Sequence, residues 1–157
     1  GIDNNKEALD YIKNEMNATD VFEFDLIKDS TPPFESQFDF ILLGEILEHT
    51  PNPIEFLTAI HKKYKGKITN IIVTVPNALR LANFKNSIRN KEIINSDHYY
   101  EFSPYTLSRV LHNSGFKILE LNTAFYDSVK KHGFFHKIIY NKYNILRDDL
   151  IAVASFE

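Results

Sequence analysis

The sequence predicts an α/β fold built on a mostly parallel sheet with helices on both faces. Hydrophobic segments of strand length alternate with amphipathic segments of about ten residues, and this alternation indicates repeated strand–helix units. The run Phe-Asp-Phe-Ile-Leu-Leu at 38–43 is apolar on both sides of the predicted strand, as in a strand inside a covered sheet. The 157-residue chain has the size of a single domain with a real core.

Asparagines mark the ends of the first predicted helix. Asn4 or Asn5 suits its N-terminus and Asn17 suits its C-terminus, because asparagine caps free N–H groups and tolerates the left-handed conformation. The apolar residues of this segment share one helical face: Ala8, Leu9, Ile12 and Met16. A short strand is predicted next, over 21–24.

The next predicted helix has clear boundaries. Asn52 is a suitable cap, Pro53 suits the first helical position, and Glu55 follows three residues after the cap. Gly66 is the expected end of this helix. A buried strand over 71–75 follows.

The last part of the chain continues the alternation. Pro76-Asn77 closes the preceding strand, because proline cannot continue a hydrogen-bonded ladder. The remaining predicted elements are an irregular helix over 78–95, a helix that begins at Ser103-Pro104 and stops at Gly115, and strands over 116–121 and 150–156.

Composition narrows the functional classes. The net charge of −3 gives no overall attraction for phosphate backbones, so nucleic acid is not the expected partner. The absence of cysteine excludes disulfides, thiolate metal sites and a cysteine nucleophile. No apolar stretch approaches the roughly 20 residues that span a bilayer. The first residues lack the basic and apolar parts of a signal peptide, so the expected location is cytoplasmic.

Acidic residues follow three of the predicted strands. Asp3 comes after the opening Gly-Ile, Asp25 follows the strand over 21–24, and Glu45 follows the strand over 38–43. Ligands of open α/β sheets bind at the carboxyl ends of strands, and ionised carboxylates only accept hydrogen bonds. The series therefore predicts a ligand with hydroxyl and amino donors. The alternative is that each acid only complements a helix dipole.

The order of several short motifs resembles that of class I S-adenosylmethionine-dependent methyltransferases, in the small-molecule and glycan group that carries Leu-Glu-His. The resemblance covers 1–122. The motifs are Gly1-Ile2-Asp3, Phe38-Asp39 leading to Leu47-Glu48-His49, Thr74-Val75-Pro76-Asn77, His98, Phe102-Ser103-Pro104-Tyr105-Thr106-Leu107 and Gly115-Phe116. It implies a Rossmann-like methyltransferase fold with an antiparallel last strand, and S-adenosylmethionine as the cofactor with S-adenosylhomocysteine as its product.

The resemblance also assigns cofactor contacts. Asp3 is expected to accept hydrogen bonds from the ribose hydroxyls, and Asp25, with Leu26 beside it, is expected at the adenine. Gly44 and Glu45 are expected at the methionine end, where glycine permits close approach and a carboxylate faces a cation.

Two histidines are candidates for the acceptor side. His98 and His49 are each predicted as catalytic, with either one as the base for a hydroxyl of a small molecule or sugar, because imidazole exchanges protons near neutral pH. The alternative for each is a structural role: His98 pins its loop, and His49 faces the interior or is held by Glu48. Methyl transfer depends mainly on alignment, so a base matters only for oxygen acceptors.

The glycine-rich loop that this family places after its first strand is not found in the sequence. The chain contains five glycines and no Gly-x-Gly pair. We therefore expect a single methyltransferase domain over 1–157 that is incomplete at the N-terminus, with a variable insert or lid over 123–149. The competing hypothesis is a methyltransferase-like binding module or partner subunit without catalysis.

Two further features leave alternatives open. The segment 130–147 has five basic residues interleaved with apolar ones, which is typical of a core helix with a solvated back but also of a lid, a homodimer surface or a surface for anionic ligands. Glu45, Glu48, His49 and His61 suggest a metal hydrolase. Their spacing does not match the His-Glu-x-x-His zinc pattern, so no metal site is expected.

Overall fold

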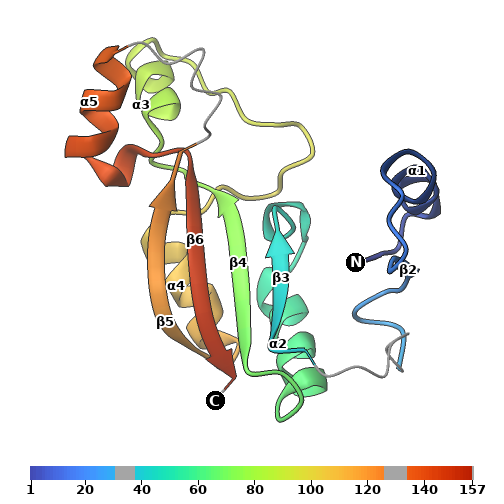
Figure 1. Ribbon diagram of the computed structural model, residues 1–157. Helices are drawn as coiled ribbons and strands as arrows, with labels where there is room; N and C mark the ends of the chain where they lie inside the picture. Colours follow the sequence, from blue (N-terminus) through green and yellow to red (C-terminus); the bar gives the residue numbers. More distant parts are fainter. Residues whose placement is uncertain (31–37, 126–133, 157) are drawn as a thin grey trace. The chain divides into compact units, whose positions relative to one another are not determined.

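The computed structural model describes residues 1–30, 38–125 and 134–156 (Figure 1). Its chain divides into two compact units, Gly1–Gln37 and Phe38–Glu157. None of the helices in the described part of the chain combines the length and apolar character needed to cross a membrane.

The first unit contains two short parallel strands and one helix. Strand β1 (Ile2–Asp3) pairs with β2 (Phe22–Glu23), and helix α1 (Lys6–Met16) connects them. The predicted caps are confirmed: the Asn5 side chain accepts a hydrogen bond from the Ala8 N–H at 3.2 Å, and Asn17 adopts the left-handed conformation with φ 53°. The apolar side of this unit buries Leu9 and Phe24.

The second unit contains a four-stranded sheet. Strands β3 (Phe40–Gly44), β4 (Asn70–Pro76), β5 (Phe116–Ala124) and β6 (Asp149–Phe156) lie in the order β3-β4-β6-β5 (Figure 1). The β3–β4 pair is parallel, whereas β6 is antiparallel to both of its neighbours. The antiparallel last strand is confirmed. Strands β3, β4 and β5 run in the same direction and β6 alone opposes them, which agrees with the expectation of a mostly parallel sheet with an antiparallel last strand.

The helices of the second unit begin where local signals predict them. Asn52 caps α2 (Pro53–Tyr64) by accepting from the Glu55 N–H at 3.2 Å, and a Ser103–Thr106 capping box starts α4 (Pro104–Asn113). Helix α4 packs against β5 and α2. The irregular helix predicted over 78–95 is reduced to α3 (Leu81–Ile88).

Three short elements complete the unit. They are the 3-10 turns η1 (Leu47–His49) and η2 (Asn144–Leu146), and helix α5 (Phe134–Lys142). Figure 1 shows α3 and α5 beyond the carboxyl ends of β4 and β5. Part of the predicted basic amphipathic segment, 130–133, lies outside the described residues. Further along it, Tyr140 is buried and Ile138 is 47% exposed, so the segment contributes partly to the core.

Strand β3 is less covered than its sequence predicts. Among the described residues it pairs with β4 alone, and Phe40 and Leu42 are 53% and 59% exposed. Burial on both faces of this strand is therefore not observed. A strand whose residues are apolar on both faces shows no polar–apolar alternation. Its sequence therefore does not tell whether it lies at the edge or in the middle of a sheet. The fully buried core residues of this unit include Ile71 and Val73 of β4 and Leu107 of α4.

Gly115 occupies a position that an alanine fits poorly. Its φ is +91°, and an added Cβ would lie 3.2 Å from the His61 ring. Gly115→Ala is expected to lower the free energy of unfolding by about 1–3 kcal/mol, from left-handed strain and the ring contact. Urea denaturation measures this change. Gly66→Ala is the matched control, since its φ is +79° and nothing lies within 4 Å of its added Cβ. An equal loss in both variants would show that the His61 ring moves aside without cost.

Candidate functional site

The carboxyl end of β3 has an unusual backbone. Glu45 follows Gly44 with φ 53°, a left-handed conformation that non-glycine residues rarely adopt, and its N–H donates to the Thr74 carbonyl at 3.0 Å. An alanine Cβ at Gly44 would meet only the Thr74 hydroxyl, at 3.8 Å, so the surrounding protein does not require glycine there. The bend at Glu45 directs the chain into η1, which carries Glu48 and His49.

Glu48, His49 and His98 form a carboxylate–histidine cluster. One potential ligand atom from each lies within 4.8 Å of the others. The two imidazole rings meet edge to face with centroids 4.7 Å apart, and His49 Nε2 lies 3.9 Å from Glu48 Oε1. The backbone N–H of Tyr99 donates to the Glu48 carbonyl at 2.7 Å, which ties the loop of His98 to η1. The structure thus brings together both predicted catalytic histidines.

The hydrogen bond of His49 determines its neutral tautomer. His49 Nδ1 lies 3.0 Å from the Asp97 carbonyl oxygen. Because a carbonyl only accepts, Nδ1 carries the hydrogen. In the neutral ring the lone pair is therefore on Nε2, which faces Glu48. The hydrogen bond to the carbonyl oxygen favours one orientation of the ring.

Glu48 was not among the site residues predicted from the sequence. Its side chain is 1% exposed, and neither carboxylate oxygen has a hydrogen-bond partner among the described residues. Burial, reinforced by the Glu45 carboxylate, raises the pKa of Glu48 above its ordinary value. The signal in the sequence is its place between Leu47 and His49 after a strand end. That signal does not reveal burial.

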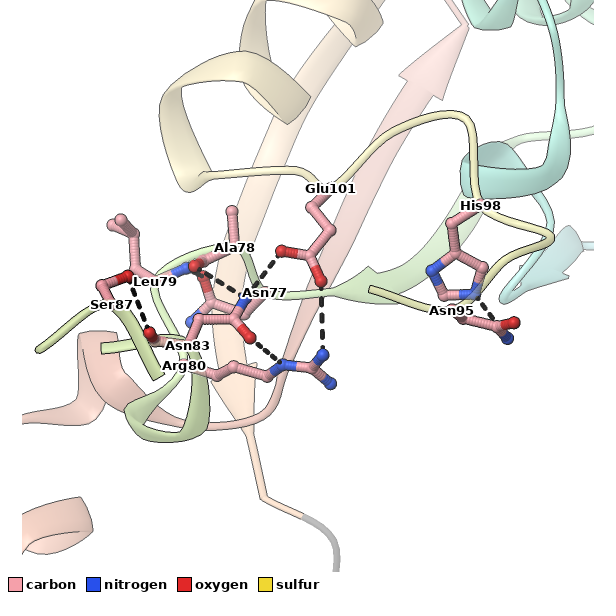
Figure 2. A network of polar contacts seen from close by, with 9 residues as sticks. All are labelled: Asn77, Ala78, Leu79, Arg80, Asn83, Ser87, Asn95, His98 and Glu101. Atoms are coloured by element: carbon pink, nitrogen blue, oxygen red, sulfur yellow. Dashed lines mark hydrogen bonds and ion pairs between the residues drawn. The ribbon is translucent and has the colours of Figure 1, made fainter. Parts of the chain in front are cut away.

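A polar network holds the segment that leads to His98. Arg80 donates to Glu101 at 3.2 Å, and the Asn83 amide donates to the other Glu101 oxygen at 2.6 Å and to the Ala78 carbonyl at 3.1 Å (Figure 2). Figure 2 also shows the 3.3 Å contact between the Asn95 amide and His98 Nε2. These residues were not among the sequence candidates, because their partners are far apart in the chain.

Asp149 adds another perturbed carboxyl at the start of β6. Burial first, then the Glu45 and Asp148 carboxylates, raises the pKa of Asp149 to about 7, with Glu48 adding to the rise and Arg80 opposing it. Several acidic groups therefore act on one another at the end of the sheet where β3 and β4 finish. The sequence shows Asp148-Asp149 before the last strand but not this coupling.

The raised pKa of Asp149 predicts a pH dependence of stability. The folded state holds the proton more tightly than the unfolded chain, so the stabilisation is complete below about pH 4 and is lost as the pH rises through about 7. In urea denaturation from pH 5 to 8, Asp149→Asn should gain stability relative to the unchanged protein as the pH rises. Glu120→Gln, on the exposed part of β5, should give no such trend. Parallel curves for Asp149→Asn and the unchanged protein would contradict the prediction.

The predicted adenosine contacts belong to the first unit. Asp3 ends β1, and Asp25 follows β2 by two residues, so the parallel pairing places both acids at the same edge of that sheet. Asp3 Oδ1 accepts from the Asn5 N–H at 2.8 Å, the one donor to the Asp3 carboxylate among the described residues. Leu26 is half-buried beside Asp25.

Asp25 already has local partners. Its Oδ1 accepts from the Ile27 and Lys28 N–H groups at 2.9 and 3.0 Å, and Lys28 Nζ lies 3.2 Å from Oδ2. These hydrogen bonds lower the pKa of Asp25, so the carboxylate is ionised and organises a turn. Asp25 therefore has a structural role in addition to the predicted one.

A protein-family model described as a methyltransferase domain matches residues 2–121. Comparison with curated proteins finds no match. Among solved structures, the chain is similar to an S-adenosylmethionine-dependent methyltransferase from Archaeoglobus fulgidus, with 19% identity and a TM-score of 0.59 over 99% of this chain and 74% of that one.

Two other solved structures show the same likeness. A Haloferax volcanii protein in complex with the Trm112 methyltransferase activator has 15% identity and a TM-score of 0.63, over 99% of this chain and 70% of that one. Magnesium protoporphyrin IX methyltransferase from Synechocystis PCC 6803, with bound S-adenosylmethionine, has 10% identity and a TM-score of 0.56, over 100% of this chain and 58% of that one. At such identities the likeness shows the fold alone.

Proposed function

Since the chain belongs to the methyltransferase-domain family and is an S-adenosylmethionine-dependent methyltransferase, we propose that its acceptor is a hydroxyl group of a small molecule or sugar. The observation that carries this proposal is the carboxylate–histidine cluster. Glu48 and His49 Nε2 present hydrogen-bond acceptors to the same small space, 3.9 Å apart. A hydroxyl donates a hydrogen bond to such a group before it reacts.

The residues at the strand ends fit the cofactor. S-adenosylmethionine supplies an electrophilic methyl group, which bonds to the acceptor oxygen while the carbon–sulfur electron pair stays on sulfur. The ribose hydroxyls and the amines of this cofactor are donors, and Asp3 retains a carboxylate oxygen without a described donor. We assign the ribose to Asp3, the adenine to Asp25 and Leu26, and the methionine end to Gly44 and Glu45.

His98 and His49 are assigned to the acceptor hydroxyl. An imidazole nitrogen takes the hydroxyl proton as the oxygen bonds to the methyl carbon. The Asp97 carbonyl orients His49, and Asn95 contacts His98. A polar cavity of about 210 Å³ between α3 and the residues that precede Asn95 offers room for part of the acceptor, and Asn83 and Glu101 line it.

A product assay tests the acceptor class. The full-length protein is incubated with radiolabelled S-adenosylmethionine and matched pairs of acceptors, each a sugar alcohol and the corresponding amino compound. Label transfer to the hydroxyl member is expected. Transfer only to the amine would overturn the hydroxyl assignment and leave the enzyme class intact.

Asp3→Ala tests the ribose assignment. The variant is expected to bind S-adenosylmethionine more weakly by about 1.5–3 kcal/mol, because a charged acceptor loses its hydroxyl partners. Isothermal titration calorimetry measures the affinity. Asp10→Ala, on the exposed face of α1, is the matched control and should bind like the unchanged protein. Equal affinity of Asp3→Ala and the control would remove Asp3 from the cofactor site.

A further inference from the structure

We propose that Glu48, His49 and His98 together bind one divalent metal ion. This goes beyond the proposed function, since methyl transfer with an imidazole base needs no metal. It also differs from the sequence prediction. No metal site was expected there, because the spacing of neighbouring residues does not match the His-Glu-x-x-His pattern. Here one ligand comes from a loop about 50 residues away in the chain.

The distances are close to those of a metal site. One donor atom from each side chain lies within 4.8 Å of the others. Ligand atoms bound tetrahedrally at about 2.1 Å to one ion are about 3.4 Å apart. The longest separation in the cluster must therefore shorten by up to about 1.4 Å when an ion binds. His49, which is 42% exposed, has space for such a movement.

The Nε2 lone pair of His49 faces the carboxyl group of Glu48. His49 donates its Nδ1 hydrogen to the Asp97 carbonyl, so Nε2 presents a lone pair to Glu48 Oε1 at 3.9 Å. Metal-binding histidines usually donate their second nitrogen to a carbonyl or carboxylate in this way. Two hydrogen-bond acceptors that face each other repel, whereas a cation between Nε2 and the carboxylate is attracted to both.

Glu48 supplies a second, independent observation. Both of its oxygens are buried, and neither has a hydrogen-bond partner among the described residues. No lysine or arginine in the described segments forms an ion pair with it. Burial of an unpaired carboxylate is costly unless it binds a cation or is neutralised. Glu45 and Asp149 add negative charge nearby, which favours the cation.

His98 completes the set. Its Nδ1 is buried and has no hydrogen-bond partner within the described part of the chain, while Nε2 contacts the Asn95 amide at 3.3 Å. For Nδ1 to bind a metal, Nε2 must carry the hydrogen, and the Asn95 side chain must then present its oxygen. Asparagine achieves this by a rotation of its amide.

The donor set indicates the class of metal. Two imidazoles and one carboxylate suit first-row divalent ions such as Mn²⁺, Fe²⁺, Co²⁺ and Zn²⁺. Three protein ligands leave open positions, where an acceptor hydroxyl bound to the ion would release its proton to solvent more easily, and its oxygen would bond to the methyl carbon as the carbon–sulfur bond breaks. The histidines would then act as ligands, and the ion would activate the hydroxyl.

Titration of the metal-free, full-length protein with Mn²⁺ tests the site. Electron paramagnetic resonance follows free Mn²⁺, and one ion per chain is expected to bind. Glu48→Gln and His98→Ala should each weaken binding at least about tenfold. His112→Ala, an exposed histidine on α4, should bind like the unchanged protein. A rise in melting temperature with Mn²⁺, reversed by EDTA, provides a second readout that both variants should lose.

The outcomes of these experiments separate the metal site from the proposed function. Absence of saturable Mn²⁺ binding, or equal binding by the Glu48→Gln and unchanged proteins, would overturn the metal site. A variant that does not fold is replaced by His49→Ala, whose ring is partly exposed. Methyl transfer that continues unchanged in EDTA would also overturn the role of the ion while supporting the proposed function. Stoichiometric Mn²⁺ binding without methyl transfer to any hydroxyl would instead leave the metal site standing and remove the proposed acceptor.

Discussion

Replacing His98 by alanine is expected to slow methyl transfer by about 100-fold or more and to change the affinity for S-adenosylmethionine by less than about twofold. The structure places His98 against His49, with ring centroids 4.7 Å apart. Loss of its ring removes either a proton acceptor or a metal ligand. Single-turnover rates and calorimetric affinities for the same preparations separate the two effects.

The control for this prediction is His112→Ala, which removes an exposed imidazole from α4. It should leave both the rate and the affinity unchanged. If His98→Ala transfers methyl groups at the rate of this control, His98 only holds its loop. Titration of His98→Ala with Mn²⁺ distinguishes the remaining roles. If His98 is a metal ligand, the variant binds Mn²⁺ more weakly than the unchanged protein. If His98 is only a base, the two proteins bind Mn²⁺ equally.

Asn77→Ala is expected to lower the free energy of unfolding by at least about 3 kcal/mol. Asn77 is completely buried, and its amide donates to the Ile145 and Arg147 carbonyls at 2.8 and 2.7 Å. Its side-chain oxygen accepts from the Leu79 N–H at 3.0 Å. Truncation removes the partner of all three backbone groups, in hydrogen bonds that are part-buried. Chemical denaturation followed by circular dichroism measures the loss.

Asn122→Ala is the matched control for Asn77. Its amide donates only to the Glu120 carboxylate on the same exposed strand, at 3.2 Å, so its removal should cost less than about 0.5 kcal/mol. Similar losses in the two variants would show that water replaces the Asn77 contacts. Asn77→Asp should behave like Asn77→Ala, because a carboxylate cannot donate to the two carbonyls.

The elements that the sequence predicted well are those with local signals. Helices α2 and α4 begin at Asn52 and Ser103 because each side chain satisfies N–H groups within three residues. Strand β6 was found from its apolar run, and the family resemblance supplied its antiparallel direction. The Rossmann-like methyltransferase fold is supported by similar solved structures. Predicted strand ends differed by up to three residues, since β5 continues to Ala124.

Long-range features were predicted less well. The order β3-β4-β6-β5, the exposure of Phe40 and Leu42, and the shortening of the 78–95 helix follow from pairing and packing with distant segments. The same limit applies to the single-domain interpretation over 1–157 and to the insert or lid over 123–149, which remain predictions.

Sequence alone identified the candidate chemistry: acids after strand ends and two histidines, because a strand end is visible wherever an apolar run stops. Only the tertiary structure decided how these groups meet. It brought His98 onto His49, buried Glu48 without a hydrogen-bond partner among the described residues, and raised the pKa of Asp149 to about 7. The physical reason is that burial and electrostatic coupling depend on atoms within a few ångströms in space, and those atoms come from segments far apart in the chain.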